Sequence, residues 1–212
     1  LEKYRSLYGD QSAEAAKALV ALGLLRDAQA RYDDAEKLTR QALDVVQAKL
    51  SASDPQAARA TAALGRVLED RGQYRDAIPV LQDAIRLDQK PGASAADLAA
   101  STSELANCYF YLGEYHLSET LNRQVLEIQQ RLYGDRHPMV ADTLINLGAI
   151  QYDLGNYAEA ENFDRQALTT TQAWYGDAHP ETASAMTILA RAQVPQKKLD
   201  EASGLVERAG AW

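Results

Sequence analysis

The sequence repeats itself about every 42 residues along a chain of 212. A leucine followed by a small residue marks each repeat, and the small residues are Gly23, Gly65, Ala106, Gly148 and Ala190. The steps between them are 42, 41, 42 and 42 residues. A fixed period in this range is typical of a solenoid, in which each unit buries its apolar face by stacking on its neighbours. The periodicity therefore predicts a repeat architecture and points to binding rather than to chemistry.

Each repeat reads as two helices joined by a tight turn, and the fourth repeat shows the pattern. Pro138 suits the first position of a helix, because its missing N–H would have no partner there, and His137 before it can act as the N-cap. Apolar residues then recur at three-to-four spacing until Gly155, which permits a left-handed turn. A second helix runs from near Tyr157 to Tyr175. With only 6 prolines and 7% aromatic residues, the composition also favours helix over sheet.

In these motifs the chain resembles the tetratricopeptide repeat, in the 42-residue form found in kinesin light chains. The segments that carry the likeness are 133–148 and 154–161, and residues 175–183 nearly copy the opening of the first of them. The likeness covers essentially the whole chain. It implies an all-α fold, a right-handed α-solenoid of antiparallel helix pairs, whose first helices line the concave face.

The repeat register predicts five units in one continuous array, namely 12–53, 54–94, 95–136, 137–178 and 179–212. Residues 1–11 match the end of an inner unit, so we expect them to be the C-terminal end of a preceding repeat helix. In the last unit Pro195 stands where the first helix should finish, and the second helix ends early. A divergent capping unit and an artificial end of the chain would both explain this, and the second explanation is preferred.

One position departs from the family pattern. The aromatic residue usual four residues after the second-helix alanine is replaced by Thr39, Leu81, Asn122, Asp164 and Val206. Because this position packs between helices, its polar substitutes predict locally wetter packing. Small residues such as Gly148 and Ala160 are expected to let the two helices of a unit cross closely.

The resemblance implies that a peptide lies in the concave groove, held by side chains of the first helices. The candidate peptide-binding residues are Arg59, Arg66, Ser103, Asn107, Phe110, Tyr111, Asp142, Asn146, Tyr152 and Arg191. Asn107 and Asn146 occupy places where grooves of this family commonly carry asparagines that hydrogen-bond the ligand backbone. An amide offers both a donor and an acceptor for that role. A solvated polar face is the open alternative for both residues.

Aromatic and charged side chains suggest how a ligand would be held. Phe110, Tyr111 and Tyr152 are expected to form an aromatic cluster facing the groove, with a place in the core as the alternative for one of them. Three arginines could meet an acidic peptide: Arg59, Arg66 and Arg191. Four carboxylates could meet a basic one: Glu69, Asp70, Asp142 and Asp153. The sign of the ligand's charge therefore stays open.

No pattern in the sequence indicates catalysis. The pairs Asp135–His137 and Asp177–His179 recur one repeat apart, too far for the three or four convergent ligands of a metal, and helix capping explains them better. Cys108 is the only cysteine, lies among apolar residues and is expected to be a buried thiol. The glycines are isolated turn residues rather than a phosphate-binding loop. We therefore expect no enzyme activity, no cofactor and no metal.

Composition also narrows the class of partner. A net charge of −8 argues against a nucleic-acid or anionic-membrane surface and suits a basic partner segment better. No apolar run approaches the ~18 residues of a membrane span. The lone cysteine is compatible with a cytoplasmic location, which we expect. The predicted partner is a protein or peptide; the alternative function is self-association, or docking within a larger signalling protein.

Overall fold

A computed structural model describes residues 12–49, 55–90 and 92–211, and every regular element in these ranges is helical. The elements are α2 (Ala13–Asp27), α3 (Tyr32–Lys49), α4 (Pro55–Asp70), α5 (Tyr74–Asp88), α6 (Ala95–Tyr111), α7 (Tyr115–Tyr133), α8 (Pro138–Asp153), α9 (Tyr157–Tyr175), α10 (Pro180–Gln193), the 3-10 turn η1 (Val194–Gln196) and α11 (Leu199–Ala209). The predicted all-α fold of consecutive helix pairs is confirmed. The helix expected at the start of the chain lies outside the described residues.

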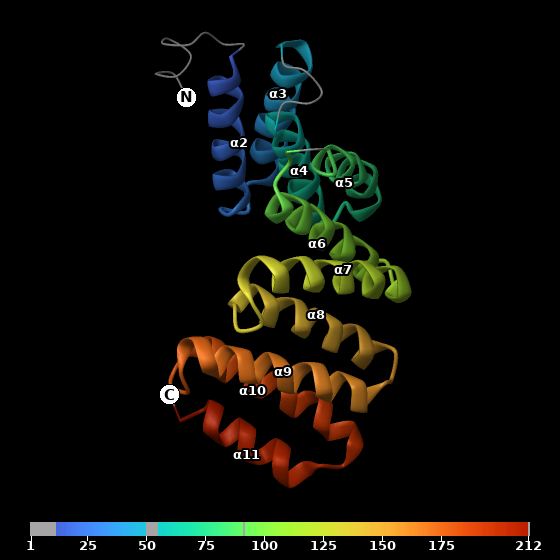
Figure 1. Cartoon of the computed structure of the whole chain (residues 1–212), viewed down its shortest axis with the longest axis vertical. Helices are drawn as coiled ribbons and strands as arrows, with labels where there is room; N and C mark the ends of the chain where they lie inside the picture. The colour runs from blue at the N-terminus through green and yellow to red at the C-terminus, as the bar shows by residue number, and fades with distance from the viewer. Residues whose placement is uncertain (1–11, 50–54, 91, 212) are drawn as a thin grey trace. The chain divides into compact units, whose positions relative to one another are not determined.

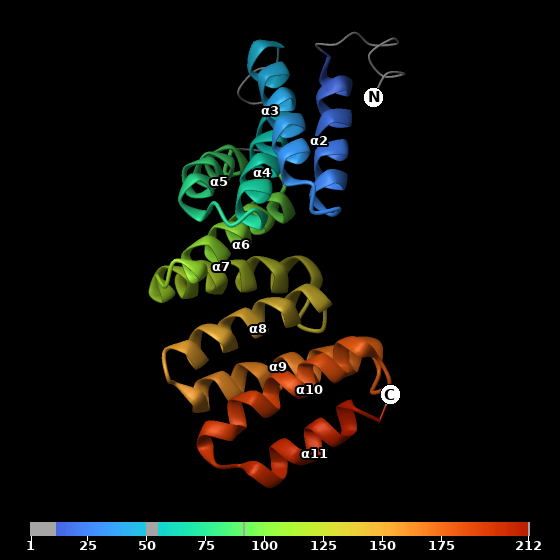
Figure 2. The same ribbon diagram turned by 180° about the vertical axis from the view of Figure 1, so that it is seen from behind.

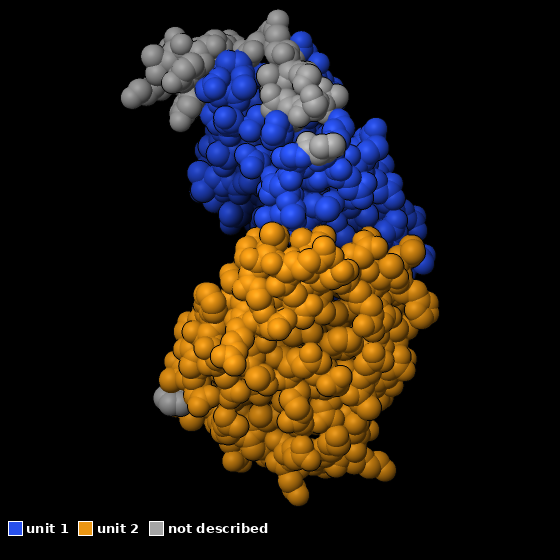
Figure 3. All heavy atoms as spheres, viewed as in Figure 1, with its two compact units in different colours: residues 1–114 blue, residues 115–212 orange. Residues whose placement is uncertain are grey.

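The chain divides into two compact units, Leu1–Glu114 and Tyr115–Trp212 (Figure 3). Within unit 1, α2 packs on α3 and α4, and α4 packs on α5 and α6 (Figure 1). The first helices α2, α4 and α6 thus form one layer, against which α3 and α5 lie. Within unit 2, α9 packs between α8 and α10, and α10 also packs on α11 (Figure 2). The division falls between α6 and α7, and the predicted repeat boundaries stay a prediction.

Side chains cap the N-termini of four first helices, and two of these caps are the histidines that the sequence predicts. In α2 and α6 a serine hydroxyl accepts a hydrogen bond from the backbone N–H three residues later. In α8 and α10 a histidine Nδ1 accepts from the N–H two residues later. The cap distances are 3.0 Å for Ser12, 3.2 Å for Ser94, 3.3 Å for His137 and 3.2 Å for His179. These caps satisfy backbone donors that the helix itself leaves free.

The two helices of one repeat cross closely where the first helix carries glycine. A β-carbon on Gly65 would lie 2.5 Å from Cδ2 of Leu81, and one on Gly23 would lie 2.8 Å from Cγ2 of Thr39. Since real β-carbons do not approach other atoms this closely, these positions require glycine for the observed packing. The expectation of small residues at the helix crossings is confirmed.

The side chains beside these crossings are buried, and the expectation of locally wetter packing there stays a prediction. At the position that lacks the family's usual aromatic residue, the side chains of the first four repeats are buried. The polar ones are Thr39, Asn122 and Asp164. Thr39 donates a hydrogen bond to the carbonyl of Ala35 at 2.9 Å, and Asn122 donates to the carbonyl of Ser118 at 3.0 Å. Thr39 is therefore satisfied by its own helix, whereas Oδ1 of Asn122 and both oxygens of Asp164 are buried without a hydrogen-bond partner among the described residues.

Candidate functional site

A pocket of about 250 Å³ opens between α2, α4 and α6 of unit 1. Its floor is apolar and is formed by Val20, Leu24, Ala58, Ala62, Ala63 and Ala100. Its polar wall consists of Arg59, Arg66, Asp88, Asp97, Ser101 and Glu104. Two of the predicted groove residues, Arg59 and Arg66, therefore lie together on one wall of a concave site. The short alanine side chains on the floor are what leaves the space open.

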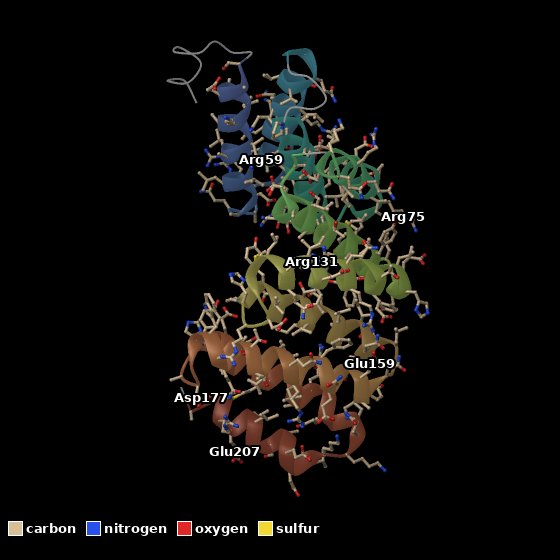
Figure 4. All side chains as sticks on the ribbon, in the orientation of Figure 1. Arg59, Arg75, Arg131, Glu159, Asp177 and Glu207 are labelled. Carbon is tan, nitrogen blue, oxygen red and sulfur yellow. The ribbon has the colours of Figure 1, made fainter. Side chains whose placement is uncertain are left out.

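Arg59 on α4, which is labelled in Figure 4, forms an ion pair with a carboxylate of the next first helix. Its Nε donates to Oδ2 of Asp97 on α6 at 3.1 Å. Both side chains are partly exposed, at 53% and 36%. An exposed pair of this kind contributes about 1 kcal/mol or less to stability, so its main effect is to orient the guanidinium across the pocket.

Arg66 lies at the centre of carboxylates from three helices. Its Nε is 3.4 Å from Oδ2 of Asp70, 3.7 Å from Oδ2 of Asp27 and 3.9 Å from Oε1 of Glu104. Burial by itself would lower the pKa of the Arg66 guanidinium, but the charges of Glu104 and Asp70 raise it above its ordinary value. We call Arg66 with Asp27, Glu69, Asp70 and Glu104 the Arg66 cluster.

Two carboxyls of the Arg66 cluster have pKa values well above their ordinary range. Burial, followed by a hydrogen bond and the charge of Glu104, raises the pKa of Glu69 to about 9. Burial, followed by the neighbouring carboxyl of Asp70, raises the pKa of Asp27 to about 6. In both cases the charge of Arg66 acts in the opposite direction and is outweighed. One guanidinium is therefore not enough to neutralise the carboxyls around it.

The remaining predicted residues of unit 1 lie along α6. Tyr111 is 60% exposed and stacks on Tyr74 with ring centroids 4.9 Å apart, and Phe110 meets Tyr111 edge-on at 5.6 Å. Ser103 and Asn107 are half-buried. The amide of Asn107 makes no hydrogen bond to another described residue, so its donor and acceptor are free for a ligand.

In unit 2 the structure brings together two of the predicted residues. The guanidinium carbon of Arg191 on α10 lies 4.6 Å from the centroid of the Tyr152 ring on α8, a cation–π contact. Tyr152 also meets Tyr157 edge-on at 5.3 Å. Also on α8, Asp142 is exposed and Asn146 is half-buried. The aromatic cluster of Tyr152 with Phe110 and Tyr111 joins residues of different units and stays a prediction.

The sequence reasoning missed Glu104, which contributes to both the pocket and the Arg66 cluster. The signal that could have found it is the repeat register, because Glu104 lies 42 residues before Asn146 and so takes the same place in the preceding repeat. It also missed Asp97 as the partner of Arg59. That pairing links residues 38 apart, and no local pattern indicates it.

The residues that were considered as metal ligands or as a nucleophile have structural roles. His137 and His179 accept hydrogen bonds as helix caps. Cys108 is buried as predicted, and burial together with the charge of Glu69 raises the pKa of its thiol to about 12. Such a thiol stays protonated and is a poor nucleophile. Within the ranges that the structure describes, no helix combines the length and the apolar character needed to cross a membrane.

Comparison with known proteins agrees with the fold. A family model of the tetratricopeptide repeat matches residues 14–90, 97–173 and 150–209, and a second one matches residues 62–131. BtubC from P. vanneervenii has a similar fold, with a TM-score of 0.83 and 23% identity over 94% of this chain and 80% of that one. A Podosopora anserina protein assigned to the kinesin light chains has a TM-score of 0.81 and 22% identity, over 94% and 95% of the two chains.

A more distant similarity is to a Rap protein whose structure was solved in complex with Competence and Sporulation Factor. It has a TM-score of 0.75 and 16% identity over 92% of this chain and 53% of that one. Among curated protein sequences, none matches the chain significantly. At these identities the solved structures show a shared fold.

Proposed function

Because the chain belongs to the tetratricopeptide repeat family, we propose that it is a protein-interaction module whose first helices in unit 1 bind an extended peptide segment of a partner. The observation that supports this best is the pocket between α2, α4 and α6, which joins an apolar floor to a charged wall. Binding sites commonly combine apolar contact area with a few placed polar groups. A cytoplasmic location stays the expectation from the sequence.

The α2, α4 and α6 layer offers the two kinds of contact that peptide recognition needs. The alanines on the pocket floor leave room for a ligand side chain, which would bury apolar area there. On α6, the free amide of Asn107 can both donate to and accept from a peptide backbone. The Rap protein bound to Competence and Sporulation Factor supports the proposal in so far as its fold is similar.

A selection from a random peptide library tests the proposal directly. The full chain would be compared with Ala62→Phe, which places a ring into the pocket from a half-buried position on its floor. The matched control is Ala158→Phe, at an exposed position of α9 in unit 2. We expect a motif that the wild type and Ala158→Phe enrich and that Ala62→Phe does not. Enrichment of the same motif by a folded Ala62→Phe variant would show that the peptide binds elsewhere.

Self-association is a second candidate function, favoured by exposed apolar side chains in unit 2. Val194 of η1 and Leu199 and Val206 of α11 are 53%, 59% and 52% exposed. Large apolar side chains that are left exposed can mark an interaction site. Sedimentation equilibrium of the full chain would show a mass that rises with concentration and that Leu199→Glu reduces to the monomer. A monomer at all concentrations would exclude this function.

A further inference from the structure

We propose that the ligand group recognised by unit 1 is cationic, an arginine or lysine side chain of the partner peptide that enters the pocket and joins the carboxyls of the Arg66 cluster. This inference rests on the proposed peptide-binding function and specifies the chemistry of its ligand. It answers the question that the sequence leaves open, namely the sign of the ligand's charge.

Carboxyls outnumber cations around the pocket, even when Glu69 is counted as protonated. The wall of the pocket and the Arg66 cluster together contain two cations and six carboxyls: Arg59, Arg66, Asp27, Glu69, Asp70, Asp88, Asp97 and Glu104. Because Arg59 already pairs with Asp97, Arg66 is the cation that remains to neutralise the other carboxyls near it. An additional positive charge placed here would be attracted by several partners at once.

Asp27 supplies an observation that is independent of this count. Its side chain is 3% exposed, and its Oδ2 lies 3.7 Å from Nε of Arg66. Its other oxygen, Oδ1, is buried and accepts no hydrogen bond in the part of the chain that the structure describes. A buried oxygen without a donor is rare in proteins. Asp27 does not line the pocket itself but contacts Arg66, which does, and an ammonium or guanidinium group that passes Arg66 would provide the missing donor.

The shape of the pocket also fits a long basic side chain. Lysine and arginine carry three or four methylene groups before the charge, and these pack well on apolar surface. Val20, Leu24 and Ala62 offer such surface on the floor, and Glu104 adjoins it on the wall. A ligand carboxylate would bind less favourably, because it would have to displace Asp97 from Arg59 or Asp70 from Arg66.

The protonated carboxyls of the cluster provide a second measurable consequence. A cation that enters favours the ionised form of Glu69, so protons should be released as the ligand binds. Other groups face Glu69 as well: Arg66 and Asp70 of α4, Tyr74 of α5, and Glu104 and Cys108 of α6. Tyr74 and Cys108 themselves titrate only at higher pH, because the pKa of each is raised.

The experiment uses the full chain and four pools of fluorescent nonapeptides. The pools are random except for a fixed central Arg, Lys, Gln or Glu, and binding is measured by fluorescence anisotropy at low salt. We expect the Arg and Lys pools to bind about tenfold more tightly than the Glu pool, since a single close charge contact is worth about that much. Glu104→Gln should reduce this preference about fivefold. The matched control is Glu207→Gln at an exposed site of α11 (Figure 4), which should leave it unchanged.

The outcomes separate the two proposals. If Ala62→Phe weakens all four pools equally and the wild type shows no preference for Arg or Lys, the peptide site stands and the cationic ligand is wrong. If Glu104→Gln behaves like Glu207→Gln, the Arg66 cluster does not select the ligand. If no pool binds the wild type better than Ala62→Phe, both proposals are overturned. Calorimetry of the Arg pool in two buffers of different ionisation enthalpy should also show proton release, and its absence would contradict a role for Glu69.

Discussion

Gly148 of α8 and the carboxyl of Asp164 on α9 lie so close together that no side chain could replace the glycine without moving the acid. Asp164 is 1% exposed, and neither of its oxygens has a hydrogen-bond partner among the described residues. Burial raises its pKa to about 7, even though the charge of Arg191 acts to lower it. An unpaired carboxyl in a closed helix interface is costly when it is ionised.

This arrangement makes the stability of unit 2 depend on pH. The folded state holds the Asp164 proton more tightly than the unfolded state, whose carboxyl has a pKa near 3.8. The stabilisation is therefore complete below that value and is lost as pH rises through about 7. The unfolding free energy of Asp164→Asn minus that of the wild type can be measured by urea unfolding at pH 5 and at pH 8. We expect this difference to be about 2–3 kcal/mol larger at pH 8 than at pH 5. Equal differences at the two pH values would show that Asp164 titrates normally.

The same contact predicts that Gly148→Ala is destabilising. The added methyl group would meet the Asp164 carboxyl and the carbonyl of Ala160, so we expect a loss of about 1–3 kcal/mol of unfolding free energy. Gly204→Ala in α11 is the matched control, because nothing lies within 4 Å of its β-carbon position. That variant should gain up to about 1 kcal/mol through helix propensity. A gain in both variants would rule out the close crossing of α8 and α9.

The histidine cap of α8 can be separated from its ring contacts. His137 accepts a hydrogen bond from Met139, and its ring stacks on Tyr133 with centroids 4.5 Å apart. His137→Asn keeps a capping acceptor but loses the ring, whereas His137→Ala loses both. We therefore expect His137→Ala to be less stable than His137→Asn by about 1 kcal/mol in thermal unfolding. If the two variants melt together, the cap does not contribute.

Glu161 connects α9 to the last helices through a network of donors. Its carboxylate accepts hydrogen bonds from Lys198 at 2.6 Å, Arg165 at 2.8 Å and Gln193 at 3.2 Å. Burial would raise its pKa, but these donors, Lys198 first, lower it to about 2. The stabilisation is therefore present above the ordinary value of 4.5 and is lost as pH falls toward about 2.

Glu161→Ala should lower the unfolding free energy by about 1–3 kcal/mol at neutral pH, because it removes the buried acceptor that several partly buried donors share. The effect should shrink as pH falls below about 4, where the wild type loses the same interaction. Glu207→Ala, an exposed glutamate on α11, should change stability by less than about 0.5 kcal/mol. A loss in Glu161→Ala no larger than in Glu207→Ala would show that the network does not stabilise unit 2. Urea unfolding of the three proteins between pH 3 and pH 7 provides the comparison.

Features that depend on neighbouring residues could be predicted from the sequence. The histidine caps at His137 and His179 and the turn glycine Gly155, with a φ of 79°, all follow from a local pattern. The hydrogen bonding of the polar residues that replace the usual aromatic residue could not be predicted in the same way. Thr39 is satisfied by its own helix, Asn122 only through its NH2 group and Asp164 not at all, and which of these occurs depends on packing against the neighbouring helix.

The candidate site shows the same division. The repeat period alone determined that the chain forms helix pairs and that residues such as Arg59, Arg66 and Asn107 belong to first helices, because helical periodicity and turn chemistry are local properties of the sequence. Only the tertiary structure placed Asp27, Arg66 and Glu104 from three different helices within one cluster. Charge balance and burial there depend on distances across helices, which the order of residues along the chain does not contain.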